Sequence, residues 1–148
     1  MTAPWSVVGL GSLVGMLAVD AVFDFGNDTA AARTYYCTLL PTLFSFPWCL
    51  RVVVPVAFSG MCILKNLSSN GSSCHAGTCA ALLLGGMPCF YVSVESVSAM
   101  CQDSALAERS MEKLRWAHAV MALVFCVGIA FELAGSRRTH SDSLEKKD

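Results

Sequence analysis

Ionisable side chains lie inside stretches of sequence that are otherwise apolar, and these are the residues whose types could do chemistry. Asp20 and Asp24 lie four residues apart in "GMLAVDAVFDFG" and therefore on one face of a helix. Arg51, Glu95 and His118 lie in three further apolar stretches. Carboxylates and histidine can form ion pairs, carry protons or act as general acids and bases. Because an ionised group in hydrocarbon is costly, we expect these residues to be partnered or functional.

The stretches that hold these residues are long enough to cross a membrane. A crossing takes about 20 apolar residues in a helix, and four windows approach or exceed that length, near residues 5–25, 42–64, 79–101 and 115–135. Of the 148 residues, 55% are hydrophobic and 14% are charged, whereas a soluble domain carries about 25% charged residues. We therefore predict an all-α integral membrane protein, a four-helix transmembrane bundle with short loops.

The predicted topology sets the domain organisation and the orientation. Residues 1–135 form one transmembrane domain, and residues 136–148 form a polar, flexible C-terminal tail. Four crossings place both termini and the second loop on one side of the membrane. The basic residues are Lys65, Arg137, Arg138, Lys146 and Lys147 on that side and Arg33, Arg109, Lys113 and Arg115 on the other. The positive-inside rule narrowly favours cytoplasmic termini, and the sequence indicates no particular organelle.

Counting from the membrane face that holds the first and third loops puts the ionisable residues in one leaflet. Asp20 and Glu95 lie about 9 Å inside that face, and Arg51 lies about 10 Å inside it. Asp24 lies near the edge, and His118 lies about one turn in. This matched depth predicts a polar cluster between helices, facing the interior of the bundle. Asp20 and Arg51 are predicted partners because they come from consecutive antiparallel helices.

Two of the predicted helices contain residues that interrupt helical hydrogen bonding. Pro47 and Pro55 lie in the second helix, and Gly85, Gly86 and Pro88 lie in the third. Proline removes a backbone donor and frees the carbonyl four residues earlier. Irregular backbone within a membrane survives only where it is buried in protein or lines a wet cavity. We therefore predict kinks in both helices.

The eight cysteines do not form a redox motif. The sequence has no C-x-x-C, which argues against a thiol oxidoreductase. Five cysteines fall in predicted spans, where cysteine behaves as a small apolar residue: Cys49, Cys62, Cys89, Cys101 and Cys126. Cys74 and Cys79 of "CHAGTC" could close a loop disulfide in an oxidising compartment, or ligate a metal weakly with His75. The simpler interpretation is that they do neither, and we predict no metal and no other cofactor.

Three functions are compatible with this pattern. Membrane helices lack the usual hydrophobic force between them, so polar contacts can set their order. This favours a scaffold, an assembly factor or an accessory subunit of a membrane complex. The alternative is a conduit or carrier for a small solute, ion or proton, which would need an oligomer because four short helices enclose little space.

An intramembrane enzyme is the third interpretation, and it is less favoured. There is no H-x-x-x-H, no E-x-x-H and no serine nucleophile motif, so no catalytic residue is assigned. The expected partners are the lipid bilayer and a membrane protein or a second copy of the chain. A formal net charge of −1 gives no reason to expect nucleic acid.

Overall fold

The structure is a computed structural model that describes residues 5–26, 28–39, 54–70 and 73–145. This part of the chain is almost entirely helical and contains no strand. The elements are α1 (Trp5–Asp24), α2 (Thr29–Thr34), the π-helical η1 (Tyr35–Leu39), α5 (Val54–Asn70), α6 (Ser73–Ala81), the π-helical η3 (Leu82–Gly86), α7 (Met87–Gln102), the 3-10 helix η4 (Ser104–Leu106) and α8 (Ala107–Glu145). The prediction of an all-α fold is confirmed for these residues.

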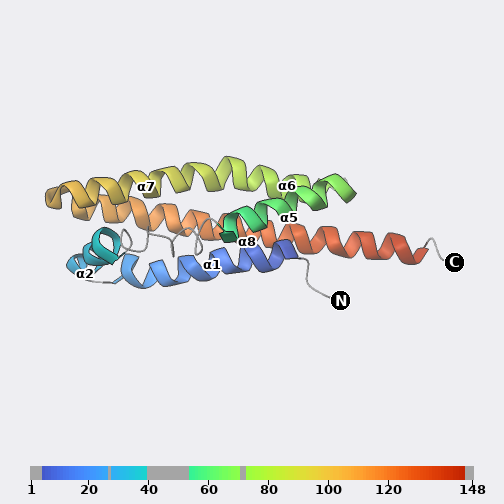
Figure 1. The fold of residues 1–148 in the computed structure, drawn as a ribbon, viewed down its shortest axis with the longest axis horizontal. Helices are drawn as coiled ribbons and strands as arrows, with labels where there is room; N and C mark the ends of the chain where they lie inside the picture. The colour runs from blue at the N-terminus through green and yellow to red at the C-terminus, as the bar shows by residue number, and fades with distance from the viewer. Residues whose placement is uncertain (1–4, 27, 40–53, 71–72, 146–148) are drawn as a thin grey trace.

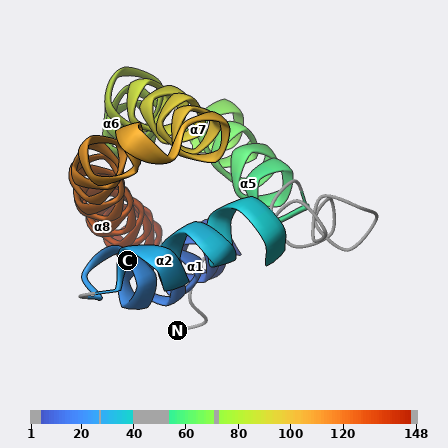
Figure 2. The same ribbon diagram turned by 90° about the vertical axis from the view of Figure 1, so that its left-hand side faces the viewer.

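Long helices lie side by side along the molecule (Figure 1). α6, η3 and α7 follow one another without a break and form one rod that runs antiparallel to α8. α1 packs on α8, and α5 packs on α1 and on α6. In the end-on view, α8 and α5 lie on opposite sides, with α1 on one side between them and α6 and α7 on the other (Figure 2). We call the end that carries α2 and η1 the α2 end, and the opposite end the terminal end.

Three helical segments of the described residues are long and apolar enough to cross a membrane. They are Trp5–Asp24, Ser73–Gln102 and Ser104–Arg137, which match the first, third and fourth predicted windows. The second window, residues 42–64, falls largely outside the described residues, and α5, which overlaps its end, has 17 residues. The crossing predicted for the second window, and membrane insertion itself, therefore stay predictions.

The third and fourth helices are longer than predicted. The third begins at Ser73 instead of residue 79, so most of the predicted second loop is helical. α8 continues to Glu145, so residues 136–145 form a helix where a flexible tail was expected. Its 39 residues extend about 58 Å, beyond the roughly 30 Å hydrocarbon core of a bilayer. Hydropathy shows where a helix is apolar and not where it ends, because polar residues can continue the same hydrogen-bond ladder in water.

The junction between α6 and α7 is a π-helical turn that directly precedes Pro88. Pro88 has no N–H, so the carbonyl of Leu84 has no donor four residues later. At the end of the turn, the Met87 N–H donates to the Leu82 carbonyl, five residues earlier. The structure thus places an irregular turn in the third predicted helix, where the glycines and the proline lie.

Glycine at this turn allows α8 to approach closely. A Cβ at Gly85 would lie 2.7 Å from Cγ2 of Val124, whereas a Cβ at Gly86 would have only ordinary contacts. In the second predicted helix, Pro55 lies in the first turn of α5, and Pro47 lies outside the described residues. The kink predicted there remains a prediction.

Candidate functional site

A buried contact between a carboxylate and a histidine joins the last residue of α1 to α8. Oδ2 of Asp24 lies 2.6 Å from Nδ1 of His118, and both side chains are buried. The Tyr36 hydroxyl donates to Oδ1 of Asp24 at 2.6 Å. Nε of Arg115 donates to the backbone carbonyl of Asp24. These four residues, which we call the Asp24 centre, fix the end of α1 to both η1 and α8.

A short capped helix after α1 leads to the tyrosine of this centre. α1 ends at Asp24, and Asp28 then caps α2. Its Oδ1 accepts the backbone N–H groups of Ala30 and Ala31 at 2.9 and 3.0 Å. Such an N-cap satisfies donors that a helix start leaves open. The cap therefore starts the short helix that leads directly into η1 and its tyrosines.

Two adjacent tyrosines of η1 cover the acidic end of α1. The Tyr35 hydroxyl donates to Oδ1 of Asp20 at 2.8 Å, and its ring stacks on Phe23 with a centroid distance of 3.9 Å. Asp20 and Asp24 thus each accept a bond from one of the two tyrosines. Burial and the bond to Asp24 raise the pKa of Tyr36 above its ordinary value. The Tyr36 hydroxyl therefore stays protonated and remains a donor at physiological pH.

Of the residues predicted to cluster, the structure brings Asp24 and His118 into contact and places Asp20 four residues away on the same helix. Arg51 lies outside the described residues, so its pairing with Asp20 remains a prediction. Glu95 is on the outer face of α7 and does not join the centre. The expectation that Glu95 faces the interior of the bundle is wrong.

The direction of Glu95 follows from the packing of α7. Ser93, Ser96 and Met100 are buried and define the face of α7 that packs on α8. Glu95 follows Ser93 by two positions, which is about 200° around the helix, so it points away from that face.

A second carboxylate–histidine contact lies at the terminal end. Glu132 of α8 is fully buried, with Oε1 2.9 Å from Nδ1 of His75 in α6. Its Oε2 accepts a bond from the Ser6 hydroxyl of α1 at 2.6 Å. We call these three residues the Glu132 centre. Glu132 lies in the fourth predicted window and was not included in the predicted polar cluster, although the predicted topology puts the start of α1 at the same membrane face.

The two centres lie on one face of α8. His118 and Glu132 are 14 residues apart, close to four helical turns and about 21 Å along the axis. Buried apolar side chains separate the two centres along both helices: Leu10 and Leu13 lie between Ser6 and Asp24 in α1, and Met121 lies between His118 and Glu132 in α8. The Thr78 hydroxyl adds a polar contact there, 3.3 Å from the Cys74 carbonyl and 3.4 Å from that of Gly128.

The cysteines pair differently from the sequence interpretation. Cys37 of η1 and Cys101 of α7 form a disulfide, so Cys101 is not the simple apolar residue that was expected. Cys74 and Cys79 are not bonded to each other. Both lie in α6, and five positions along an α-helix separate two Cα atoms by about 8.6 Å, beyond the roughly 7 Å that a disulfide spans. The possible loop disulfide is therefore not formed, because the segment is helical.

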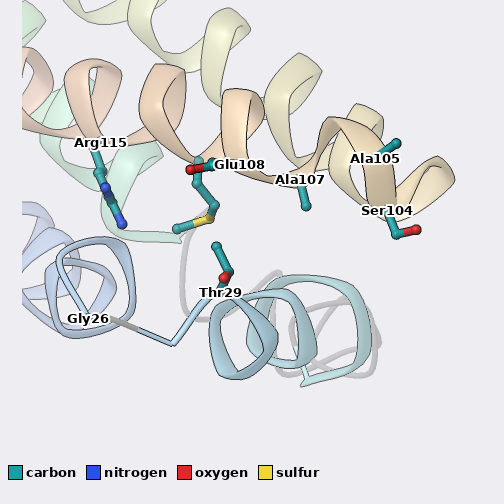
Figure 3. Close-up of a pocket in the computed structure, with 8 residues that line it drawn as sticks. Gly26, Thr29, Ser104, Ala105, Ala107, Glu108 and Arg115 are labelled. Carbon is teal, nitrogen blue, oxygen red and sulfur yellow. The ribbon is translucent and has the colours of Figure 1, made fainter.

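A cavity of about 470 Å³ opens beside the Asp24 centre, between the starts of α2 and α8. Figure 3 shows Thr29 on its α2 side and Glu108 and Arg115 on its α8 side. Arg115 belongs to both the cavity and the centre. Within the described residues, no group of three or more His, Cys, Asp or Glu side chains is placed to hold a metal ion. The expectation of no cofactor remains a prediction.

The chemistry available at both centres is proton sharing between a carboxylate and an imidazole. Each carboxylate oxygen of Asp24 and Glu132 already accepts or shares a hydrogen bond within the protein. Comparison with known protein families, with curated proteins and with solved structures finds no match to this chain. The function is therefore argued from the geometry.

Proposed function

We propose that the chain is a four-crossing membrane protein that serves as a scaffold, an assembly factor or an accessory subunit of a membrane complex. The observation that carries this proposal is how its buried polar groups are satisfied. Among the described residues, no buried side-chain nitrogen or oxygen lacks a hydrogen-bond partner. The buried carboxylates of both centres are joined to side chains of other elements, and this supports a role in fixing the helices.

The outer surface supports insertion in a bilayer. Large apolar side chains are exposed along the helices, including Val19 and Val22 of α1, Leu84 and Phe90 of the α6–α7 rod, and Leu123 of α8. Such an apolar exterior would associate or aggregate in water. Lipid or the apolar surface of a partner protein would cover it.

The ends of the described segments support a fourth crossing. Cys37 is bonded to Cys101 at the α2 end, whereas His75 contacts Glu132 at the terminal end. The chain between residues 38 and 74 must therefore pass from one end of the bundle to the other. In a bilayer, that passage is the return crossing which four spans require.

The polar contacts act as ties between particular helices. The Asp24 centre joins α1, η1 and α8, and the Glu132 centre joins α1, α6 and α8. Packing in membranes relies on van der Waals contact and interhelical hydrogen bonds. A buried charge left alone by a slipped helix would be costly, so these ties favour one helix order. A rigid bundle of this kind is suited to present an outer surface to a membrane partner or to a second copy of the chain.

A proton conduit is the second candidate because two proton-sharing pairs lie on the same face of α8. It is less well supported, since the buried positions between the pairs are mostly apolar side chains, and a proton would need water or polar groups to pass. An oligomer could supply a path between copies. The described residues offer no arrangement that favours an enzyme over these two functions.

The test is purification of the full-length tagged protein in mild detergent, followed by native mass measurement and reconstitution. We expect a discrete complex with a membrane protein or with further copies of the chain. We also expect proteoliposomes to show proton flux equal to that of empty vesicles, measured with an internal pH dye. Flux above that background, reduced in both Asp24→Asn and Glu132→Gln but not in Glu112→Gln, would refute the scaffold proposal and establish the conduit.

A further inference from the structure

The Cys37–Cys101 disulfide lies directly beside the Asp24 centre. Cys37 follows Tyr36, which donates to Asp24, and Cys101 follows Met100, which packs in the same core cluster as Tyr36. A second link joins these segments, because Nε of Arg33 donates to the Met100 carbonyl at 3.3 Å. The disulfide therefore ties the segment that covers the two carboxylates to the end of α7.

Disulfides form and persist in oxidising compartments and are rare where thiols are kept reduced. Forming this bond removes one proton and one electron from each thiol, and a donor disulfide of a thiol oxidoreductase accepts the two electrons and becomes two thiols. The α2 end must therefore meet such a compartment. The disulfide thus constrains the orientation of the chain independently of where its basic residues lie.

We propose that the α2 end faces an oxidising compartment, that both termini are cytoplasmic, and that the disulfide holds residues 29–39 over Asp20 and Asp24. We call residues 29–39 the tyrosine cover. The orientation rests on the proposed membrane insertion. It agrees with the basic residues Arg137 and Arg138, which follow the apolar part of α8 at the terminal end. Basic residues beside a span favour the cytoplasmic side.

The clamp is needed because the cover is too short to be stable by itself. α2 has six residues and η1 has five, and isolated helices shorter than about 12 residues are marginal in water. Without the disulfide, the described contacts that hold this segment include hydrogen bonds of Tyr35, Tyr36 and Arg33, the stacking of Tyr35 on α1 and one small apolar cluster. Reduction therefore loosens residues 29–39 and opens Asp24 and His118 to water on the oxidising side.

Thiol labelling in sealed vesicles with the cytoplasmic face outward tests the orientation. The full-length protein is treated with an impermeant maleimide, and the peptides with Cys37 and Cys101 are measured by mass spectrometry. We expect these two residues to be labelled only after both permeabilisation and reduction. The thiol introduced by Lys146→Cys should be labelled in sealed vesicles. Labelling of Cys37 and Cys101 without reductant, or protection of the introduced thiol, would overturn the proposal.

Extraction of the membranes with alkaline carbonate distinguishes failure of the inference about the disulfide from failure of the proposed function. Release of the chain from membranes by alkaline carbonate would refute membrane insertion and with it the proposed function. Retention of the chain together with unpaired Cys37 and Cys101 would refute only the inference about the disulfide.

Hydrogen exchange of the protein in lipid nanodiscs tests the clamp. We expect residues 29–39 to exchange about tenfold faster in Cys37→Ser/Cys101→Ser, with α7 and α8 unchanged. The matched control is Cys89→Ser/Cys126→Ser, which replaces two cysteines that form no disulfide and should leave residues 29–39 protected. Equal protection in the two double variants would show that the disulfide does not hold the cover.

Discussion

Replacing Asp24 with alanine removes the acceptor at the middle of the Asp24 centre. The fully buried carboxylate accepts a hydrogen bond from the Tyr36 hydroxyl and shares a proton with Nδ1 of His118. After Asp24→Ala, both groups remain buried without this partner. His118→Ala is less damaging because Asp24 keeps its bond to Tyr36.

The contacts set the size of these losses. An unsatisfied buried donor costs about 1 to 3 kcal/mol, so Asp24→Ala should lower the free energy of unfolding by about 2 to 6 kcal/mol. His118→Ala should lower it by about 1 to 3 kcal/mol, the cost of one missing partner. The double variant should lose less than the sum of the two. Coupling energies measured for hydrogen bonds between membrane helices average about 0.6 kcal/mol and reach about 1.7 kcal/mol.

The assay is unfolding of the full-length protein in bicelles by added SDS, followed by far-UV circular dichroism. Glu95→Ala is the matched control because it removes a carboxylate from the exposed face of α7, and its effect should stay within about 0.5 kcal/mol. Equal losses for Asp24→Ala and Glu95→Ala would refute the buried tie. Strict additivity of Asp24→Ala and His118→Ala would show that the two side chains do not interact.

Three further predictions concern packing, the second centre and pH. Gly85→Ala should lower the free energy of unfolding by about 1 to 3 kcal/mol through overpacking. Gly11→Ala should be nearly neutral because a Cβ there meets nothing within 4 Å. The same SDS titration compares the two variants. Glu132→Gln should cost about 1 to 3 kcal/mol by weakening a charged, buried hydrogen bond, and equal loss in the exposed Glu112→Gln would contradict this. The raised pKa of Tyr36 means that the unfolded chain loses this proton first as pH rises, so stability should fall above about pH 10, the ordinary tyrosine value. Tyr36→Phe should reduce that fall and should leave the tyrosinate absorbance below about pH 10 unchanged.

Sequence reasoning located the apolar parts of three of the four predicted helices, because hydropathy is a local property that accumulates along the chain. It also placed Asp24 and His118 at one membrane face, because the order of spans determines depth. It could not give the direction of Glu95 around its helix. A membrane helix is apolar on most sides, so its hydrophobic pattern does not mark the packed face. The better signal was the small residues Ser93 and Ser96, since small residues mark helix interfaces in membranes.

The hydrogen-bond partners of Asp24 and Glu132 that lie in segments predicted to be loops were missed for a different reason. Tyr36 lies in a segment interpreted as a loop, and His75 was considered only as a metal ligand with nearby cysteines. Neither residue changes the hydropathy of a span. The cap at Asp28 that brings the tyrosines back over α1 depends on backbone geometry, which apolar periodicity does not describe.

The disulfide, in contrast, was within reach of the predicted topology. The first loop and the end of the third span were assigned to the same membrane face, and Cys37 and Cys101 lie in those two segments. Treating Cys101 as an apolar residue of the span concealed the pair. Two cysteines at one membrane face are a stronger signal than two cysteines close in sequence, because disulfide geometry depends on distance in space.

The distribution of the polar ties gives α8 a particular place in the fold. Both centres use α8, and both also use α1, so these helices are joined near each end. The described contact of α5 with α1 includes the edge-on packing of Trp5 against Phe58. Apolar contacts in lipid can be exchanged for contacts with lipid tails at little cost, whereas a buried carboxylate cannot give up its partners so readily. The pair of α1 and α8, with α6 tied at one end and η1 at the other, is therefore a part of the bundle whose order is specified by buried polar contacts as well as by apolar packing.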